Sequence, residues 1–205
     1  MKPTLLCVTG IDGAGKSTVC DFLNSNLHDC HISNIWDLME LDHVTIPFKS
    51  KLEVDNFLCH LTPDSRLLFL AHAMQYSVDK AFASGKQFIV ANSYYYKYFA
   101  TELALGANPQ LVASLMQAFP QPQLVIELVV PPQTIVIRKK HYSRYECGLA
   151  TTPNQDTFIA FQNKAMQHWY MYNKSDWQQV ASTGTIENLY AETSAIVHRF
   201  LNTNK

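Results

Sequence analysis

Glycine is scarce in this chain and is concentrated in one place. Only seven of the 205 residues are glycine, and Gly10, Gly13 and Gly15 fall within six consecutive positions. Glycine destabilises a fold wherever its conformational freedom is not required. The cluster therefore predicts a special backbone conformation close to the N-terminus.

Charge is also sparse, and its two signs are balanced. Charged residues make up 16% of the chain and the formal net charge is −1. This balance excludes an overall basic field that would attract nucleic acid or an anionic membrane. The 47% of hydrophobic residues is ample for a core and excludes general disorder.

Cysteine patterns and long apolar runs are both missing. The five cysteines are scattered without a CxxC pair, which excludes metal-ligand spacing and a disulfide framework and indicates ordinary thiols. No apolar run approaches the roughly 18 residues that cross a bilayer, and the run that stops at Gly10 is too short for a secretion signal. We expect a soluble, cytoplasmic protein with neither a membrane nor a nucleic-acid partner.

What the chain does contain is a regular alternation of strand-like and helix-like segments. Short apolar runs predict five strands, at residues 5–9, 31–36, 86–92, 123–130 and 177–181. Apolar residues at helical spacing predict helices between and after them, at residues 17–27, 62–84, 109–119, from about 156, and 186–201. The alternation predicts an α/β fold, a doubly wound five-stranded parallel sheet flanked by helices, within a single domain over residues 1–205.

The glycine cluster belongs to a phosphate-binding motif. Residues 10–17 read GIDGAGKS and fit GxxxxGK[ST], between the first predicted strand and the first predicted helix. Glycines let successive N–H groups point at phosphate oxygens, and the helix start presents its positive dipole end to the same anion. Lys16 can reach the β- and γ-phosphates, and the Ser17 hydroxyl can ligate Mg²⁺. The predicted ATP-binding residues are Gly10, Ile11, Asp12, Gly13, Ala14, Gly15, Lys16, Ser17 and Thr18.

A second nucleotide motif is spelled out near the C-terminus. Residues 173–176 read NKSD, the guanine-reading motif of GTPases. That motif should follow a buried strand, whereas here it follows a helical segment, and no DxxG motif lies between it and the phosphate loop. We interpret residues 173–176 as a polar loop before the fifth strand.

Together these features resemble the thymidylate kinase family of nucleoside monophosphate kinases over nearly the whole length. Residues 10–18 look like that family's P-loop, in which the residue matching Asp12 lies close to the acceptor sugar. Residues 67–69 resemble its helix lining the acceptor base, with Phe69 at the stacking position. Residues 127–132 and 143–146 resemble its fourth strand and its lid. The resemblance implies a P-loop NTPase-type fold, ATP and Mg²⁺ as cofactors, and phosphoryl transfer to a nucleotide.

The lid of the family corresponds to the most basic part of this chain, residues 138–157, which we call the lid segment. Its place between the fourth strand and the next helix favours a lid over a merely solvated surface. Position 14 is alanine rather than arginine, so the P-loop itself supplies no additional cation. Arg138 and Arg144 would then neutralise charge on the moving phosphoryl group. The predicted catalytic residues are Lys16, Arg138 and Arg144.

Departures from the family gather on the acceptor side. Residues 92–94 read NSY where the family has Asp-Arg-Tyr, and Ala73 stands where it has arginine. Residues 101–102 replace a Tyr-Gln pair, and residues 37–40 lack an Arg-Glu-Pro sequence. Bidentate arginine is the usual way to hold a dianionic phosphate. The acceptor pocket is therefore expected to be less cationic than in the family, which makes thymidylate itself a doubtful substrate.

Three interpretations remain open. The chain could phosphorylate a nucleotide or related small molecule with a changed acceptor site. It could instead act on a neutral hydroxyl compound such as a nucleoside, with Asp37, Glu40 or Glu102 accepting the proton. It could also bind ATP without transfer, because Asn92 replaces the family's aspartate on the metal side. The predicted acceptor-binding residues are Asp12, Phe69, Asn92, Ser93, Tyr94 and Glu102. A homodimer is compatible with each interpretation.

Aromatic residues near this site have two interpretations of their own. Residues 94–98 contain four tyrosines, and Phe69 lies beside the apolar face of its predicted helix. Such rings either stack on an acceptor base or pack in the core. Both interpretations stay open at the level of the sequence.

Overall fold

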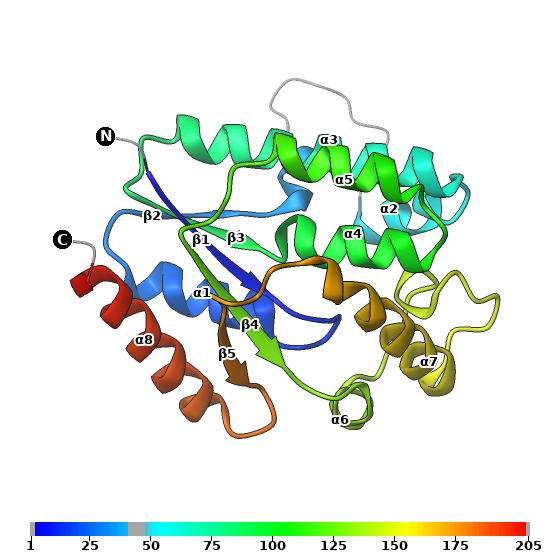
Figure 1. Ribbon diagram of the computed structural model, residues 1–205. Coiled ribbons are helices and arrows are strands. Elements are labelled where there is room, and N and C mark those ends of the chain that lie inside the picture. Colours follow the sequence, from blue (N-terminus) through cyan, green and yellow to red (C-terminus); the bar gives the residue numbers. More distant parts are fainter. Residues whose placement is uncertain (1–2, 41–47, 49, 204–205) are drawn as a thin grey trace.

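A computed structural model describes residues 3–40, 48 and 50–203. Within these ranges the centre of the molecule is a parallel sheet with the strand order β2-β3-β1-β4-β5 (Figure 1). Its strands are β1 Thr4–Thr9, β2 Cys30–Ser33, β3 Phe88–Asn92, β4 Leu124–Val129 and β5 Gln178–Ala181. The predicted fold class and the five predicted strands are confirmed.

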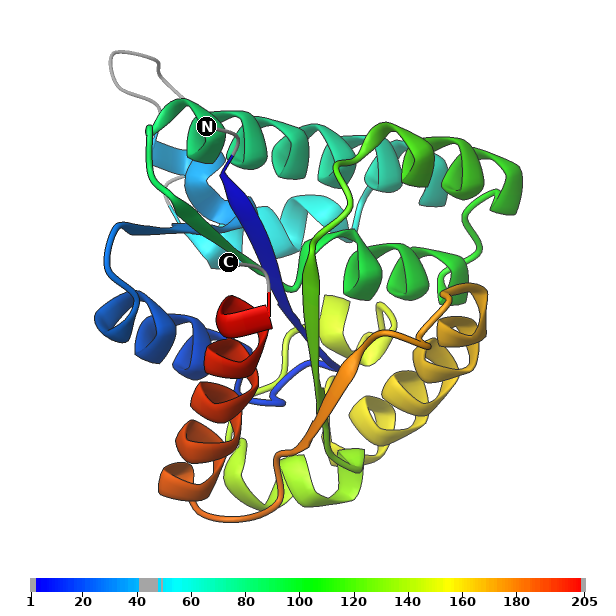
Figure 2. The same cartoon turned by 60° about the vertical axis from the view of Figure 1, so that its left-hand side comes forward.

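Helices cover both faces of the sheet. Figures 1 and 2 show α1 and α8 on one face and α3, α4 and α5 on the other. The α-helices are α1 Lys16–Asn26, α2 Lys51–Leu58, α3 Pro63–Ala83, α4 Tyr94–Ala104, α5 Pro109–Ala118, α6 Pro132–Arg138, α7 Gln155–Met166 and α8 Ile186–Thr203. Three short 3₁₀ helices are η1 Ile35–Glu40, η2 Tyr145–Cys147 and η3 Gln167–Met171. None of the described helices is both long and apolar enough to cross a membrane.

The central strand β1 is buried on both sides. Because side chains alternate along a strand, Leu5 and Cys7 enter the core under α3 and α4, while Leu6 and Val8 enter the core under α1 and α8. This two-sided burial explains why the sequence of β1 is a continuous apolar run rather than an alternating one. It also holds the end of β1 rigidly at the middle of the sheet edge.

Several helix ends follow directly from the sequence. Helix α3 begins at Pro63 after the N-cap Thr62, and the side chain of Asn108 caps α5 by accepting a hydrogen bond from the Gln110 amide. Three helices were not anticipated, namely α2, α4 and α6. Helix α6 starts at Pro132, because proline stops the strand before it but is well suited to a first helical turn.

The lid segment joins α6 to α7 across the carboxyl edge of the sheet. It begins at the last residue of α6, contains η2, and runs into the first turn of α7. The Asn154 side chain and Thr157 form a capping box that starts α7, one residue before the predicted position. The role and bounds of this segment as a lid stay a prediction.

Candidate active site

The phosphate loop connects β1 to α1, and two of its glycines cannot be replaced without conflict. Gly10 has φ +144°, and a Cβ there would lie 2.7 Å from the Leu128 carbonyl oxygen. Gly13 has φ +80°, and its Cβ would lie 2.5 Å from Cγ2 of Ile135 in α6. The loop is therefore held tightly between β4 and α6, which is the physical reason for the glycine cluster.

Lys16 begins α1 and lies inside this loop. Its Nζ donates a hydrogen bond to the Ile11 carbonyl at 2.7 Å, and the residue is 8% exposed. Burial lowers the pKa of Lys16 from 10.5 to about 8, although the nearby Asp12 carboxylate opposes this shift. A buried cation enclosed by loop amides forms an environment suited to phosphate oxygens.

Ser17 lies next to the end of β3. The Asn92 side-chain amide donates to the Ser17 Oγ at 3.1 Å, and the Ser93 hydroxyl donates to Asn92 Oδ1 at 3.3 Å. The parallel pairing of Val8 with Asn92 brings β3 to this position. Hydroxyl and amide oxygens are of the hard type that Mg²⁺ accepts. Among the described residues no group of three His, Cys, Asp or Glu side chains could hold a metal.

A cleft of about 410 Å³ opens beside the loop at the carboxyl ends of the strands. Ligands of open α/β sheets bind at this edge. Its walls come from the phosphate loop, the chain after β2 and β3, helix α4 and the lid segment. The lining residues are Asp12, Gly13, Gly15, Lys16, Ser17, Thr18, Asn34, Trp36, Asn92, Ser93, Lys97, Tyr98, Lys139, Tyr145 and Glu146.

Two ion pairs lie in the wall of this cleft. Lys97 Nζ is 2.9 Å from Asp12 Oδ1, with side chains only 7% and 14% exposed. Lys139 Nζ is 3.1 Å from Glu146 Oε1. The sequence analysis identified neither lysine as a site residue. For Lys97 a signal was present, since it is the single cation within the aromatic run of residues 94–99.

The cleft brings together most of the predicted donor residues and part of the predicted acceptor set. Gly13, Gly15, Lys16, Ser17 and Thr18 line it from the phosphate loop. The acceptor candidates that line it are Asp12, Asn92 and Ser93. The remaining loop residues, Gly10, Ile11 and Ala14, are buried and do not line the cleft.

Tyr94 and Phe69 do not line this cleft. Tyr94 is 3% exposed, and its hydroxyl donates to the Pro120 carbonyl at 3.0 Å, so core packing accounts for its ring. Phe69 is half-buried and packs against Phe57 and Phe48, with ring centroids 5.3 and 6.2 Å away. It lines a small apolar cavity that shares Trp36 with the cleft, and its stacking on an acceptor base stays a prediction. Among the four tyrosines of residues 94–98 only Tyr98 lines the cleft.

Glu102 also lies away from the cleft, within the interior. Its carboxylate accepts hydrogen bonds from Arg66 Nε at 2.8 Å and from the Tyr145 hydroxyl at 2.8 Å, and neither Glu102 nor Arg66 is exposed. Burial raises the pKa of Glu102 from 4.5 to about 7 against the opposing effect of Arg66. The expected contact of Glu102 with an acceptor is not supported, because its oxygens are occupied by these structural partners.

Of the other two candidate carboxylates, Asp37 has a structural role. Asp37 Oδ2 accepts hydrogen bonds from the Asn34 amide and the Ser77 hydroxyl, both at 3.0 Å. It thereby closes the turn after β2 and does not line the cleft. The side chain of Glu40 lies outside the described residues.

The two arginines of the lid segment lie outside the cleft. Arg138 donates to the Gly13 carbonyl at 3.0 Å and to the Ser182 carbonyl at 3.4 Å, so it supports the phosphate loop from behind. Arg144 donates to carbonyl groups of the lid segment itself, at 3.4 and 3.5 Å. The cation of this segment that lines the cleft is Lys139. The catalytic role of the arginines stays a prediction.

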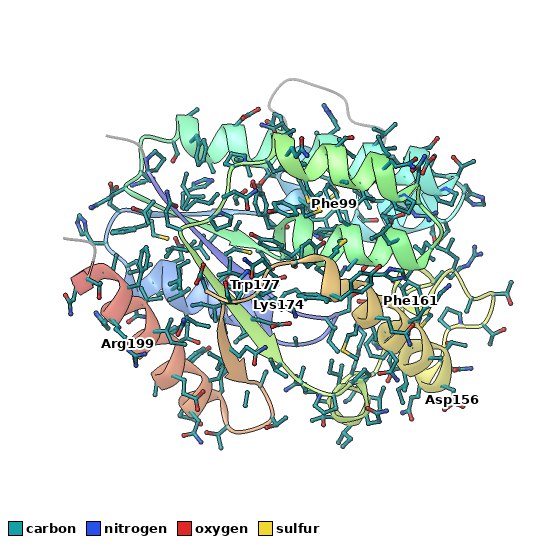
Figure 3. The ribbon with its side chains drawn as sticks, in the orientation of Figure 1. Phe99, Asp156, Phe161, Lys174, Trp177 and Arg199 are labelled. Carbon is teal, nitrogen blue, oxygen red and sulfur yellow. The ribbon has the colours of Figure 1, made fainter. Side chains whose placement is uncertain are left out.

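The NKSD sequence forms a polar loop before β5, as interpreted from its position. Lys174 Nζ is 2.6 Å from Glu127 Oε1 and lies 4.7 Å from the centroid of the Trp169 ring. Figure 3 shows Lys174 beside Trp177 over the sheet. Because the lysine is engaged with β4, the loop serves to attach β5 rather than to read guanine.

The fold and the loop define the chain as a P-loop protein of the α/β class. Within that class its resemblance to the thymidylate kinase family is confirmed by two comparisons. A probable thymidylate kinase from Sulfolobus acidocaldarius is 23% identical over 202 residues, covering 97% of this chain and 98% of the relative. The solved structure of thymidylate kinase from Candida albicans superposes with a TM-score of 0.69 at 17% identity, covering 98% and 93% of the two chains. No family model matches the chain.

Proposed function

We propose that this chain is an ATP-dependent kinase that transfers the γ-phosphoryl group of ATP to a nucleoside monophosphate or a related phosphorylated small molecule. The observation that carries the proposal is the direct opening of the phosphate loop, with Lys16 and Ser17, into a cleft large enough for a second ligand. Phosphoryl transfer depends mainly on positioning and electrostatic stabilisation. One continuous cleft that holds both partners beside a buried lysine supplies both requirements.

The residues of the loop have separate roles in this proposal. Loop amides and Lys16 hold the β- and γ-phosphates of the donor. Ser17 Oγ, which accepts a hydrogen bond from the Asn92 side-chain amide, would hold Mg²⁺, which neutralises phosphate charge when bound. Lys139 approaches from the lid segment and adds a cation where arginine is absent from the P-loop.

The cleft presents cations beyond the one that serves the donor. Its lining contains Lys97 and Lys139 in addition to Lys16, and each of these two lysines is paired with a carboxylate, Asp12 and Glu146. An ammonium group has three donors, so a phosphorylated acceptor could bind to a lysine that is already paired. The similarity to two proteins named thymidylate kinase supports a nucleotide.

A neutral hydroxyl acceptor is less well supported. It would need a carboxylate to accept its proton, but Asp37 and Glu102 are committed to structural hydrogen bonds. The carboxylates that line the cleft, Asp12 and Glu146, are each paired with a lysine, and the side chain of Glu40 lies outside the described residues. The ATP-binding module without transfer remains the second candidate. It is favoured by one observation, the neutral Asn92 amide in contact with Ser17 Oγ.

A turnover assay tests the proposal. Purified protein is incubated with Mg-ATP and, separately, with each of a panel of nucleosides and nucleoside monophosphates, and ADP release is followed. We expect release with at least one monophosphate, and its loss in Lys16→Ala. The matched control is Lys86→Ala, since Lys86 is 45% exposed and precedes β3 at the opposite edge of the sheet.

Each outcome has a definite meaning. Turnover that survives Lys16→Ala contradicts the assigned donor site. Turnover with a nucleoside and no monophosphate contradicts the proposed acceptor class. Measurable binding of Mg-ATP without turnover on any acceptor moves the assignment to the binding module.

A further inference from the structure

We propose that Lys97 binds the phosphate group of the acceptor and thereby makes the cleft selective for a phosphorylated acceptor over the corresponding neutral nucleoside. The inference rests on the proposed function and deepens it by naming the residue that binds the charged group of the acceptor. It starts from the position of a buried lysine that faces the same cleft as the phosphate loop.

The backbone fixes where Lys97 points. Helix α4 begins directly after β3 at the N-cap Ser93, and both Ser93 (φ 73°) and Tyr94 (φ 53°) adopt the left-handed region that non-glycine residues rarely occupy. The Ser93 amide donates to the Val8 carbonyl at 2.8 Å, and the Thr9 hydroxyl donates to the Ser93 carbonyl at 3.1 Å. This sharp turn is therefore tied to β1, and it directs α4 past the phosphate loop.

Lys97 lies in the first turn of α4, four residues after Ser93. Both residues line the cleft. By the family resemblance, Ser93 occupies the position of an arginine that holds the acceptor phosphate. The cation that the family has at position 93 is absent here, and Lys97 supplies a cation four residues further along the chain.

The immediate surroundings of Lys97 are unusual for an ammonium group. The side chain is 7% exposed, and Nζ lies 2.9 Å from Asp12 Oδ1 and over the rings of Tyr98 and Tyr145, at 4.4 and 5.4 Å from their centroids. Burying an ammonium group is costly, and the ion pair and rings offset that cost. Burial acts to lower the pKa of Lys97, but Asp12, together with Tyr98 and Glu146, outweighs burial and raises the pKa above its ordinary value, so the lysine stays charged.

The pair with Asp12 leaves room for a ligand. An ammonium group has three donors, of which the bond to Asp12 uses one. The P-loop carboxylate has a second holder in Gln162, whose side chain accepts from the Asp12 amide at 3.2 Å and donates to Asp12 Oδ2 at 3.5 Å. An incoming phosphate can therefore share Lys97 with Asp12 without leaving that carboxylate unsupported.

The strand order places Lys97 on the acceptor side of the loop. Because β3 and β2 lie on one side of β1 and β4 and β5 on the other, the chain after β2 and helix α4 wall the cleft on the first side. Asn34, Trp36 and Tyr98 line it there, together with Lys97. Lys16 lies within the loop itself and serves the donor, Lys139 comes from the lid segment, and Lys97 is the cation that this wall contributes to the cleft.

Binding measurements test this assignment directly. Isothermal titration is carried out with Mg²⁺ and a non-hydrolysable ATP analogue present, using each common nucleoside 5′-monophosphate and its own nucleoside as separate probes. The proteins are the wild type, Lys97→Met, Lys97→Arg and the matched surface control Lys86→Met. A fifth protein, Asp12→Asn/Lys97→Met, removes both charges and so excludes an effect of a bare carboxylate.

We expect at least one monophosphate to bind more than about 10-fold tighter than its nucleoside, because a charge-assisted hydrogen bond discriminates at this level. Lys97→Met should weaken that monophosphate by about 10- to 100-fold while the nucleoside and the ATP analogue change less than about twofold. Lys97→Arg should retain most of the preference for the monophosphate over its nucleoside, and the double variant should lose that preference as Lys97→Met does.

Three results would overturn the inference. The first is that Lys97→Met weakens the affinity for monophosphate and nucleoside equally, which would make Lys97 purely structural. The second is that the wild type binds the two with equal affinity. The third is that no monophosphate binds. Its failure is distinguishable from failure of the proposed function. If monophosphate binding depends on Lys97 but no ADP is released, only the proposed transfer reaction is contradicted. If turnover is unchanged in the Lys97 variants, only the inference on Lys97 is contradicted.

Discussion

The buried pair of Arg66 and Glu102 allows a quantitative test of how the acceptor side of the fold is held together. Both side chains are inaccessible to solvent, and their sequence positions are 36 apart. Arg66 Nε donates to the carboxylate, while Nη1 donates to the carbonyl groups of Leu58 and Leu61 at 3.3 and 3.0 Å. The perturbation that we choose is Arg66→Met, which keeps an extended side chain but removes the cation.

The pH dependence of this variant follows from linkage. The pKa of Glu102 in the folded protein, about 7, lies above its ordinary value of 4.5. Between these values the folded state binds more protons than the unfolded state, so the free energy of unfolding falls as pH rises, and the fall from this group ends near pH 7. Without Arg66 the pKa rises further, since burial is then opposed only by the Tyr145 hydrogen bond and the weaker effect of Lys97.

The expected difference has a definite size. Above pH 7 the wild type no longer loses stability through Glu102, but Arg66→Met continues to lose about 1.4 kcal/mol per pH unit. At every pH the variant also leaves the Leu61 carbonyl without its Arg66 donor, at about 1–3 kcal/mol, whereas the Leu58 carbonyl keeps the Leu61 amide as a donor. The gap between the two proteins should therefore widen by about 1–3 kcal/mol between pH 7 and pH 9.

Urea unfolding followed by circular dichroism at pH 6, 7, 8 and 9 measures this gap. The control is Arg66→Met/Glu102→Leu, which removes the titrating carboxyl as well and should run parallel to the wild type above pH 7. Other titrating groups cancel in the comparison. A gap between Arg66→Met and the wild type that stays constant from pH 7 to pH 9 would refute the reasoning.

Three further predictions concern the donor site. The affinity for an ATP analogue should fall as pH rises through about 8, because Lys16 loses its proton there. Binding above that pH should take up a proton, which titration calorimetry in buffers of different ionisation enthalpy measures. An affinity that is unchanged up to pH 9.5 contradicts this prediction. Gly13→Ala should weaken the analogue at least about 10-fold, since its Cβ has no space, whereas Gly85→Ala, with φ +71° but nothing within 4 Å, should cost about 1 kcal/mol of stability and leave binding unchanged; equal effects on binding would argue against a steric cause. Asn92→Asp should lower the Mg²⁺ concentration needed for half-maximal analogue binding severalfold, because a carboxylate then lies beside Ser17 Oγ; an unchanged or higher requirement, compared with Asn92→Ala, counts against metal binding at this position.

Features of this fold that depend on residues close together in the sequence could be predicted from the sequence. The five strands and the start of α3 follow from short runs of side chains and from capping residues, so they could be predicted. Helix α4 was missed because its residues are buried nearly all around, and its apolar run has no clear polar face to show a helical period. Tertiary burial overrode the local signal there.

On the acceptor side, matching a motif position did not ensure that a residue reaches the cleft. Tyr94 and Glu102 stand at positions that motif matching marked as functional, yet one packs against Phe119 and the other pairs with Arg66. Lys97 lay between them in the sequence with no motif to mark it. Its importance becomes visible only when α4 brings it to Asp12 of the phosphate loop.

By itself, the sequence determined the phosphate loop, the five parallel strands and the resemblance to thymidylate kinases, because each depends on residues that are neighbours along the chain. Tertiary structure alone decided which charges face the cleft. The packing of α4 beside β1 turned Lys97 toward Asp12 and left Glu102 inside with Arg66. The same kinds of charged side chain become a ligand site or a structural bond according to which partner the fold places within hydrogen-bonding distance.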